Sequence, residues 1–181
     1  MILLGYQFYP DYKELNMQKV YESARAVKDS IPAGKTITLV GGGFDLLHVG
    51  HLHLLEYSKT LGNILVVCVL SDDNIKSYKD FSRPIIGEAY RASIVAALRC
   101  VDYVYVSSID TSHENTLSII RPNSVVFGIE DTKYWREITR KREQFIKSSF
   151  PNIKIHYLQR FSDVSVSTSG IIQKIMSSHS K

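Results

Sequence analysis

The amino-acid sequence predicts an α/β protein with a Rossmann-like, doubly wound parallel sheet. After residue 35, short apolar runs alternate with longer segments of helical periodicity, the order expected of strands joined by crossover helices. The apolar runs are nearly continuous, which is typical of strands buried on both faces. Three consecutive glycines follow the first run, at the strand end where a doubly wound sheet binds its ligands.

Each predicted element has a local reason. The strands are short β-branched or aromatic segments, expected at residues 36–40, 64–70, 103–106, 124–127 and 153–158. Segments of helical pattern predict helices at residues 50–61, 88–99, 113–120, 132–149 and 168–177. A further helix is expected at about residues 15–30, because Pro and Gly in residues 31–34 punctuate the chain before the first strand. Residues 1–34 are therefore interpreted as an N-terminal extension with a helix, residues 35–177 as a single domain and residues 178–181 as a tail.

Composition limits the class of protein. The 181 residues include 22 basic and 18 acidic side chains, a formal net charge of +4, and 44% are hydrophobic, as in a folded soluble chain. No apolar run reaches the about 18–20 residues that span a bilayer, and the N-terminus lacks the basic region of a signal peptide. Cys68 and Cys100 are too few for a disulfide framework. We therefore expect a cytoplasmic protein with no membrane partner, and its charge suits a phosphorylated metabolite or a nucleic acid.

The residues that indicate chemistry lie between the first strand and the next helix. Gly41, Gly42 and Gly43 permit a turn in which backbone amides approach a phosphate, although a plain tight turn uses glycine too. His48 and His51 are three residues apart at the predicted helix start, so both imidazoles project from one face. Beside the positive end of the helix, they would stabilise charge that builds up on a transferring phosphoryl group.

Two other interpretations of the histidine pair stay open. A zinc site would need further His, Cys or carboxylate ligands, and the sequence offers no obvious set, so no metal ligand is assigned. A purely structural role is also compatible with this spacing. The glycines alone do not decide, because neither the dinucleotide-binding nor the Walker spacing is present.

The segment from Gly42 to His51 resembles the signature of the cytidylyltransferase-like nucleotidyltransferases, Gly-X-Phe-Asp-X-X-His-X-Gly-His. Further stretches resemble that family in the family's own order, at residues 71–79, 83–86, 88–92, 99–104 and 167–172. The likeness covers about residues 35–176. It implies the same α/β fold and makes residues 35–177 a nucleotidyltransferase domain.

The resemblance also implies roles for individual residues. The implied catalytic residues are His48, His51 and Lys79. The residues expected to bind the nucleotide are Gly42, Gly43, Phe44, Asp45, His48, His51, Arg91, Gly128, Ser167, Thr168 and Ser169. Those expected to bind the acceptor are Asp45, Lys79 and Arg160. Mg²⁺ is the implied cofactor, held mostly by triphosphate oxygens, and the likeness implies a homodimer.

The implied reaction transfers a nucleoside monophosphate from CTP or ATP to a small phosphorylated acceptor and releases pyrophosphate. CTP is slightly favoured, because the two ends of the likeness resemble phosphocholine and phosphoethanolamine cytidylyltransferases; the glycerol-3-phosphate enzymes belong to the same group. Residues 83–84 and 98–104 and the early helix resemble heptose-phosphate adenylyltransferases instead, with ADP-heptose as the alternative product. A catalytically inactive homologue used as a scaffold is one non-catalytic alternative, and RNA binding by the basic segment 132–147 is another. Its apolar spacing favours an amphipathic helix, so no nucleic acid partner is expected.

Overall fold

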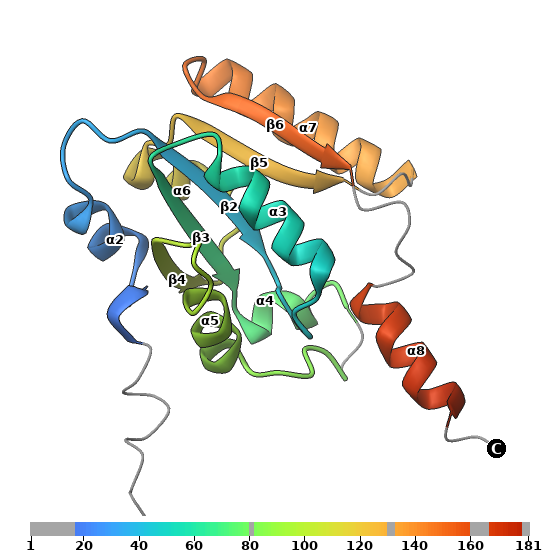
Figure 1. Ribbon diagram of the computed structural model, residues 1–181. Coiled ribbons are helices and arrows are strands. Elements are labelled where there is room, and N and C mark those ends of the chain that lie inside the picture. Colours follow the sequence, from blue (N-terminus) through green and yellow to red (C-terminus); the bar gives the residue numbers. More distant parts are fainter. Residues whose placement is uncertain (1–16, 80–81, 130–132, 160–166, 179–181) are drawn as a thin grey trace, which may run out of the picture.

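The computed structural model describes residues 17–79, 82–129, 133–159 and 167–178, and in these ranges six strands form one sheet (Figure 1). The order across the sheet is β1-β4-β3-β2-β5-β6, and every neighbouring pair is parallel. The strands are β1 Val20–Tyr21, β2 Ile37–Gly42, β3 Ile64–Leu70, β4 Tyr103–Ser107, β5 Ser124–Ile129 and β6 Lys154–Gln159. The predicted parallel sheet is confirmed.

Helices connect the strands, and all five that we expect after the first strand are present, with ends that differ by three residues at most. The helical elements are η1 Met17–Lys19, α2 Ala24–Ser30, α3 Val49–Lys59, α4 Asp72–Lys76, α5 Glu88–Ala96, α6 Glu114–Ile120, α7 Lys133–Ser149 and α8 Thr168–Ser178. Within the described ranges, none of them has both the length and the apolar character needed to cross a bilayer.

The sheet is covered by apolar side chains on both faces. Along β3, Leu65, Val67 and Val69 belong to one core cluster, and Val66 and Cys68 belong to another. The first cluster includes residues of α3 and α5, and the second includes residues of α2, α6 and α7. Alternate residues of a strand point to opposite faces, so a sheet between two helical layers requires a continuous apolar run. The doubly wound arrangement follows from that pattern.

The N-terminal extension differs from the helix expected at residues 15–30. Its described part contains η1, the two-residue strand β1 and the seven-residue helix α2. β1 pairs with β4 and adds an edge strand to the sheet. The Ser23 hydroxyl caps α2 by accepting a hydrogen bond from the Ala26 backbone at 3.1 Å. A two-residue strand is too short to leave a periodic pattern, and the sequence therefore gives no sign of it.

The connections diverge between β2 and β5. The chain passes from β2 to α3 on one face, and from β5 to α7 on the other. Because β2 and β5 are neighbours in the sheet, their carboxyl ends flank a topological switch point, where open α/β sheets bind ligands. The fold thus places the glycine- and histidine-containing loop at the position that favours a ligand.

Candidate active site

Two glycines lie at the strand ends beside the switch point. Gly42 is the last residue of β2, and Gly128 is the penultimate residue of β5. A Cβ built at Gly128 would meet the Leu54 Cδ2 atom at 3.8 Å, an ordinary contact. Gly128 is also exposed. The backbone of β5 is therefore accessible at this end, and nucleotide binding at Gly128 stays a prediction.

His48 and His51 stand together at the start of α3, as the sequence predicts. His48 is the N-cap residue and His51 the third residue of the helix. Their ring centroids are 3.9 Å apart with planes inclined by 26°, which is a stacked pair. The Phe44 ring meets His51 edge-on, with centroids 5.4 Å apart. The pair stands where the helix dipole and backbone N–H groups attract an anion.

The hydrogen bonds of the two rings assign their protons. The Nδ1 atom of His48 accepts from the Gly50 backbone at 3.1 Å, and the Nδ1 atom of His51 accepts from the His48 backbone at 3.4 Å. An accepting imidazole nitrogen carries no proton, so each neutral ring is protonated on Nε2. A Cβ at Gly50 would lie 3.1 Å from the His48 ring, and glycine therefore permits this close cap. Both rings present an Nε2–H donor.

The turn before the histidines differs from a glycine turn. Its left-handed residues are Phe44 and Leu46, with φ of 51° and 46°, whereas none of the three preceding glycines has a positive φ. Each non-glycine residue held in this region costs on the order of 1–3 kcal/mol and persists only where its surroundings fix it. Gly42 is needed instead for close packing, since its Cβ would lie 3.1 Å from the Phe44 ring.

Asp45 holds this turn from within the protein. Its side chain is only 3% exposed, and its carboxylate accepts hydrogen bonds from the Arg83 Nε atom at 2.8 Å and from the Ile85 and Ile86 backbones at 3.0 Å each. These contacts tie the turn to the segment before α5. The structure therefore gives Asp45 the role of orienting the loop; its contact with nucleotide or acceptor stays a prediction.

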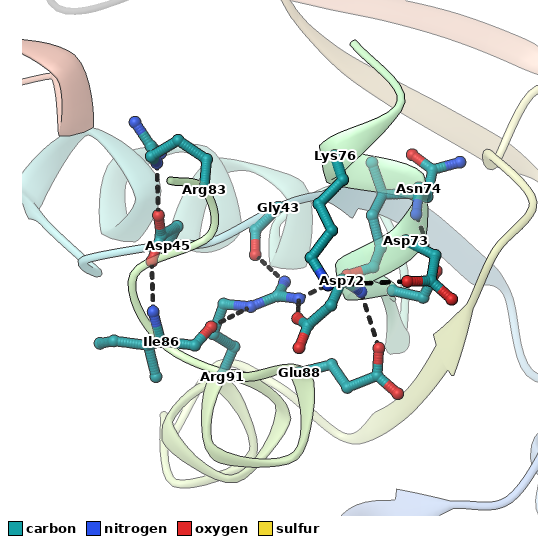
Figure 2. Close-up of polar contacts among 12 residues, drawn as sticks. Gly43, Asp45, Asp72, Asp73, Asn74, Lys76, Arg83, Ile86, Glu88 and Arg91 are labelled. Carbon is teal, nitrogen blue, oxygen red and sulfur yellow. Dashed lines mark hydrogen bonds and ion pairs between the residues drawn. The ribbon is translucent and has the colours of Figure 1, made fainter. Parts of the chain in front are cut away.

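Arg91 is the buried arginine at the start of α5. A basic residue in the first turn of a helix is expected at the surface or on a ligand, but Arg91 is 0% exposed. Its guanidinium donates to the carbonyls of Gly43, Leu70 and Ile86 and to the Asp72 carboxylate (Figure 2). In this conformation its guanidinium contacts protein atoms, and nucleotide binding by Arg91 stays a prediction. Sequence reasoning missed Asp72 as the ion-pair partner of Arg91. Its position two residues after the end of β3, at the edge where ligands bind, was the available signal.

The first residues of α8 lie against the same turn. Thr168 donates from its hydroxyl to the Asp45 carbonyl at 2.7 Å, and the Ser167 hydroxyl accepts from the Gly170 backbone at 3.0 Å. The Ser167 hydroxyl thus caps the start of α8, while phosphate binding by Ser167, Thr168 and Ser169 stays a prediction. The contact brings a second helix N-terminus to the switch point.

Lys79 lies on the exposed turn after α4, with its Nζ atom 5.8 Å from the centre of the Tyr78 ring. Arg160 lies outside the described residues. In the ranges that are described, no group of three or more His, Cys, Asp and Glu side chains is placed to hold a metal ion.

Solved structures share this architecture. The lipopolysaccharide core biosynthesis protein from Thermoplasma volcanium GSS1 is 26% identical, with a TM-score of 0.58, over 71% of this chain and 100% of that one. The pantoate-beta-alanine ligase of Francisella tularensis, with a TM-score of 0.54 at 16% identity, covers 87% of this chain and 78% of its own, and is a likeness of fold alone.

A doubly wound sheet with a stacked histidine pair at the β2–α3 junction is the arrangement expected of a nucleotidyltransferase domain. The likeness to a family signature at residues 42–51 extends over most of the chain. A family model described as cytidylyltransferase-like matches residues 39–174, and the chain belongs to that family.

Several relatives carry the name bifunctional protein HldE. The one from Syntrophotalea carbinolica is 46% identical over 95 residues, which are 52% of this chain and 19% of that protein. Those from Citrifermentans bemidjiense and Helicobacter pylori (strain HPAG1) are 35% and 38% identical over 86% and 79% of this chain. The chain spans less than a third of the length of these relatives.

Proposed function

We propose that this domain transfers a nucleoside monophosphate from a nucleoside triphosphate to the phosphate group of a small acceptor. An acceptor phosphate oxygen attacks the α-phosphorus, the bond from the α-phosphorus to the bridging oxygen breaks, and pyrophosphate leaves with that oxygen. The observation that carries the proposal is the stacked pair of His48 and His51, whose Nε2–H groups are the donors.

The two imidazoles act by stabilising charge. Negative charge on the α-phosphoryl oxygens is spread differently in the transition state than in the bound triphosphate, so fixed donors placed there lower the barrier. The acceptor phosphate is already anionic and needs no strong general base. The chemistry therefore requires positioning and hydrogen-bond donors, which a capped helix N-terminus with two histidines supplies.

The remaining expected residues complete the site in this proposal. Lys79 would hold phosphate oxygens with its ammonium group, and Ser167, Thr168 and Ser169 would bind the outer phosphates at the start of α8. Mg²⁺ binds through phosphate oxygens and one or two carboxylates and retains waters. In this site the Asp45 carboxylate already accepts three hydrogen bonds, so the metal would be held mainly by the triphosphate oxygens. When bound, it would neutralise part of the triphosphate charge.

The relatives help to rank the candidate pairs of nucleotide and acceptor. Similarity to proteins named HldE, together with residues 83–84 and 98–104, supports ATP with heptose 1-phosphate, giving ADP-heptose. The first and last motifs of the family likeness, at residues 42–45 and 167–172, support CTP with phosphocholine, phosphoethanolamine or glycerol 3-phosphate. We place the ATP pair first, because the named relatives are similar over as much as 86% of the chain.

Pyrophosphate release tests the proposal. The purified chain is incubated with Mg²⁺ and with ATP or CTP in turn, against heptose 1-phosphate, phosphocholine, phosphoethanolamine and glycerol 3-phosphate. We expect release with one pair and loss of release when EDTA removes the metal. No release with any nucleotide and any acceptor would count against nucleotidyl transfer.

Histidine variants connect that activity to the geometry. His48→Ala and His51→Ala each remove one donor, and we expect kcat to fall by about 10²–10³-fold, as for other lost transition-state donors. His53→Ala is the matched control, because it removes an imidazole from the same helix and should leave kcat within about twofold. Near-normal turnover of His48→Ala would refute its assigned role.

A nucleic acid-binding role has less support. In α7, Ile146 is buried and Phe145 packs against the same core cluster, which confirms the expected amphipathic helix. Lys141 and Lys147 form ion pairs with Glu137 and Glu143 at 2.9 and 2.5 Å, so part of the basic charge is balanced. RNA binding that weakens steeply with salt would support the alternative, and catalysis with no RNA affinity would exclude it.

The homodimer implied by the family likeness is also part of the proposal. The chain has a mass of 20.6 kDa, so light scattering coupled to gel filtration should give twice that value. A mass of one chain at all concentrations tested would exclude the dimer.

A further inference from the structure

The only charged side chain that is completely buried in the described ranges is Arg91. Burying a guanidinium is costly unless each donor finds a partner. Each of the three guanidinium nitrogen atoms of Arg91 donates, to the Asp72 carboxylate at 2.6 Å and to three backbone carbonyls. A planar fork with five N–H groups suits several acceptors at once, which an ammonium group does not. The site is therefore built for arginine.

The contacts of Arg91 and Asp45 form a closed ring. Arg91 donates to the Gly43 carbonyl and, from Nε, to the Ile86 carbonyl at 2.8 Å. The Ile86 backbone N–H donates to the Asp45 carboxylate at 3.0 Å (Figure 2). The chain from Asp45 back to Gly43 closes the ring through one residue, Phe44. Two buried, opposite charges thus hold both neighbours of Phe44.

Phe44 connects this ring to the candidate catalytic histidines. Its backbone is left-handed, with φ of 51°, and its ring is 3% exposed. The ring fills the space that Gly42 leaves, since a Cβ there would lie 3.1 Å from it, and its edge meets His51. If the Gly43 carbonyl is released, Phe44 is no longer held in its strained conformation, and its ring loses its place against His51.

We infer that Arg91 is a positioning residue for the proposed nucleotidyl transfer and acts on His51 through the Gly43 carbonyl and the Phe44 ring. This inference rests on the proposed function. The four hydrogen bonds of Arg91 are with protein atoms; through them it keeps the His51 Nδ1 atom in its capping contact and the Nε2–H donor in place. Loss of Arg91 should therefore lower kcat, because a misplaced donor stabilises the transition state less while it changes ground-state binding of the nucleotide little.

The test compares Arg91→Lys with Arg99→Lys. Both substitutions keep the charge, and Arg99 is exposed near the end of the same helical region, so it is the matched control. Long-range ¹H–¹⁵N spectra of the histidine rings report which nitrogen carries the proton, with or without turnover. Initial rates at varied nucleotide then separate kcat from KM.

For Arg91→Lys we expect the His51 signals to lose the pattern of an Nε2-protonated ring, and kcat to fall about 100-fold, the scale of a small misplacement of a reacting group. The KM for the nucleotide should change less than about threefold, and Arg99→Lys should match the unmodified protein. A folded Arg91→Lys chain with unchanged His51 signals and kcat would overturn the inference.

A second variant covers the case in which Arg91→Lys does not fold. Phe44→Leu keeps Arg91 and removes the edge contact with His51, and it should lower kcat with the same shift of the His51 signals. Unchanged His51 signals in folded Phe44→Leu would also overturn the inference. If no acceptor is turned over by the unmodified chain, the proposed function fails, whereas the histidine spectra still decide whether Arg91 positions His51.

Discussion

Replacing Asp45 by asparagine isolates the contribution of one buried carboxylate to the fold. The Oδ2 atom accepts from Arg83 and Ile85, and the Oδ1 atom accepts from Ile86. Asparagine turns one of these oxygens into an NH₂ group. Whichever way the amide is turned, at least one N–H donor then faces another donor.

The size of the effect follows from these contacts. A buried donor without a partner costs about 1–3 kcal/mol, and loss of one member of a buried ion pair costs about 3–5 kcal/mol. The Arg83 side chain is 12% exposed, so solvent replaces little of what it loses. We expect Asp45→Asn to lower the free energy of unfolding by about 4 kcal/mol.

Urea unfolding followed by circular dichroism measures this change. With an m-value of about 2 kcal/mol/M, the midpoint should fall by about 2 M. Asp73→Asn is the control, because that side chain is 94% exposed and lies 3.7 Å from Lys76, and it should stay within about 0.5 kcal/mol of the unmodified chain. A midpoint for Asp45→Asn within about 0.3 M of the unmodified value would refute the reasoning.

Three further predictions concern other parts of the molecule. Leu55→Ala empties a fully buried position in the core between the sheet and α3, so its unfolding free energy, measured in urea, should fall by about 2–5 kcal/mol. Burial raises the pKa of the Cys68 thiol to about 12, and at pH 8 iodoacetamide should label the less buried Cys100 first, with Cys68 labelled only after unfolding; equal rates measured by mass spectrometry would contradict this. Thr168→Val removes the hydrogen bond to the Asp45 carbonyl, and amide exchange in α8 should become about fivefold faster, as expected for a loss of about 1 kcal/mol; unchanged exchange would show that this contact does not hold the helix.

The strands were predictable where burial leaves a pattern. The run from Ile64 to Leu70 is apolar throughout because both faces of β3 are covered, and its predicted bounds match the structure. Helix α4 left a weaker sign: Ser71 caps it by accepting from the Asn74 backbone at 3.1 Å, yet five residues are too few for a helical period. Strand order depends on contacts between distant segments and has no local pattern.

The placement of the two histidines was predictable, whereas the contacts that hold them in place were not. The spacing of His48 and His51 defines one helix face, whatever the rest of the fold. The roles of Phe44 and Arg91 depend on where the ends of β2 and β3 meet the segment before α5, and no sequence period encodes that meeting. The burial of Arg91 could not be expected from its charge, because an arginine is rarely buried. The three backbone carbonyls that accept from its guanidinium explain its position.

The contact of Thr168 with the Asp45 carbonyl has a consequence for protein synthesis. The two residues are 123 positions apart. At about 5–20 residues per second, α8 leaves the ribosome roughly 6–25 s after the histidine loop. During that interval the nascent chain already contains both histidines but lacks the helix that lies against their turn. A nascent chain is therefore expected to lack a complete site until residue 168 has emerged.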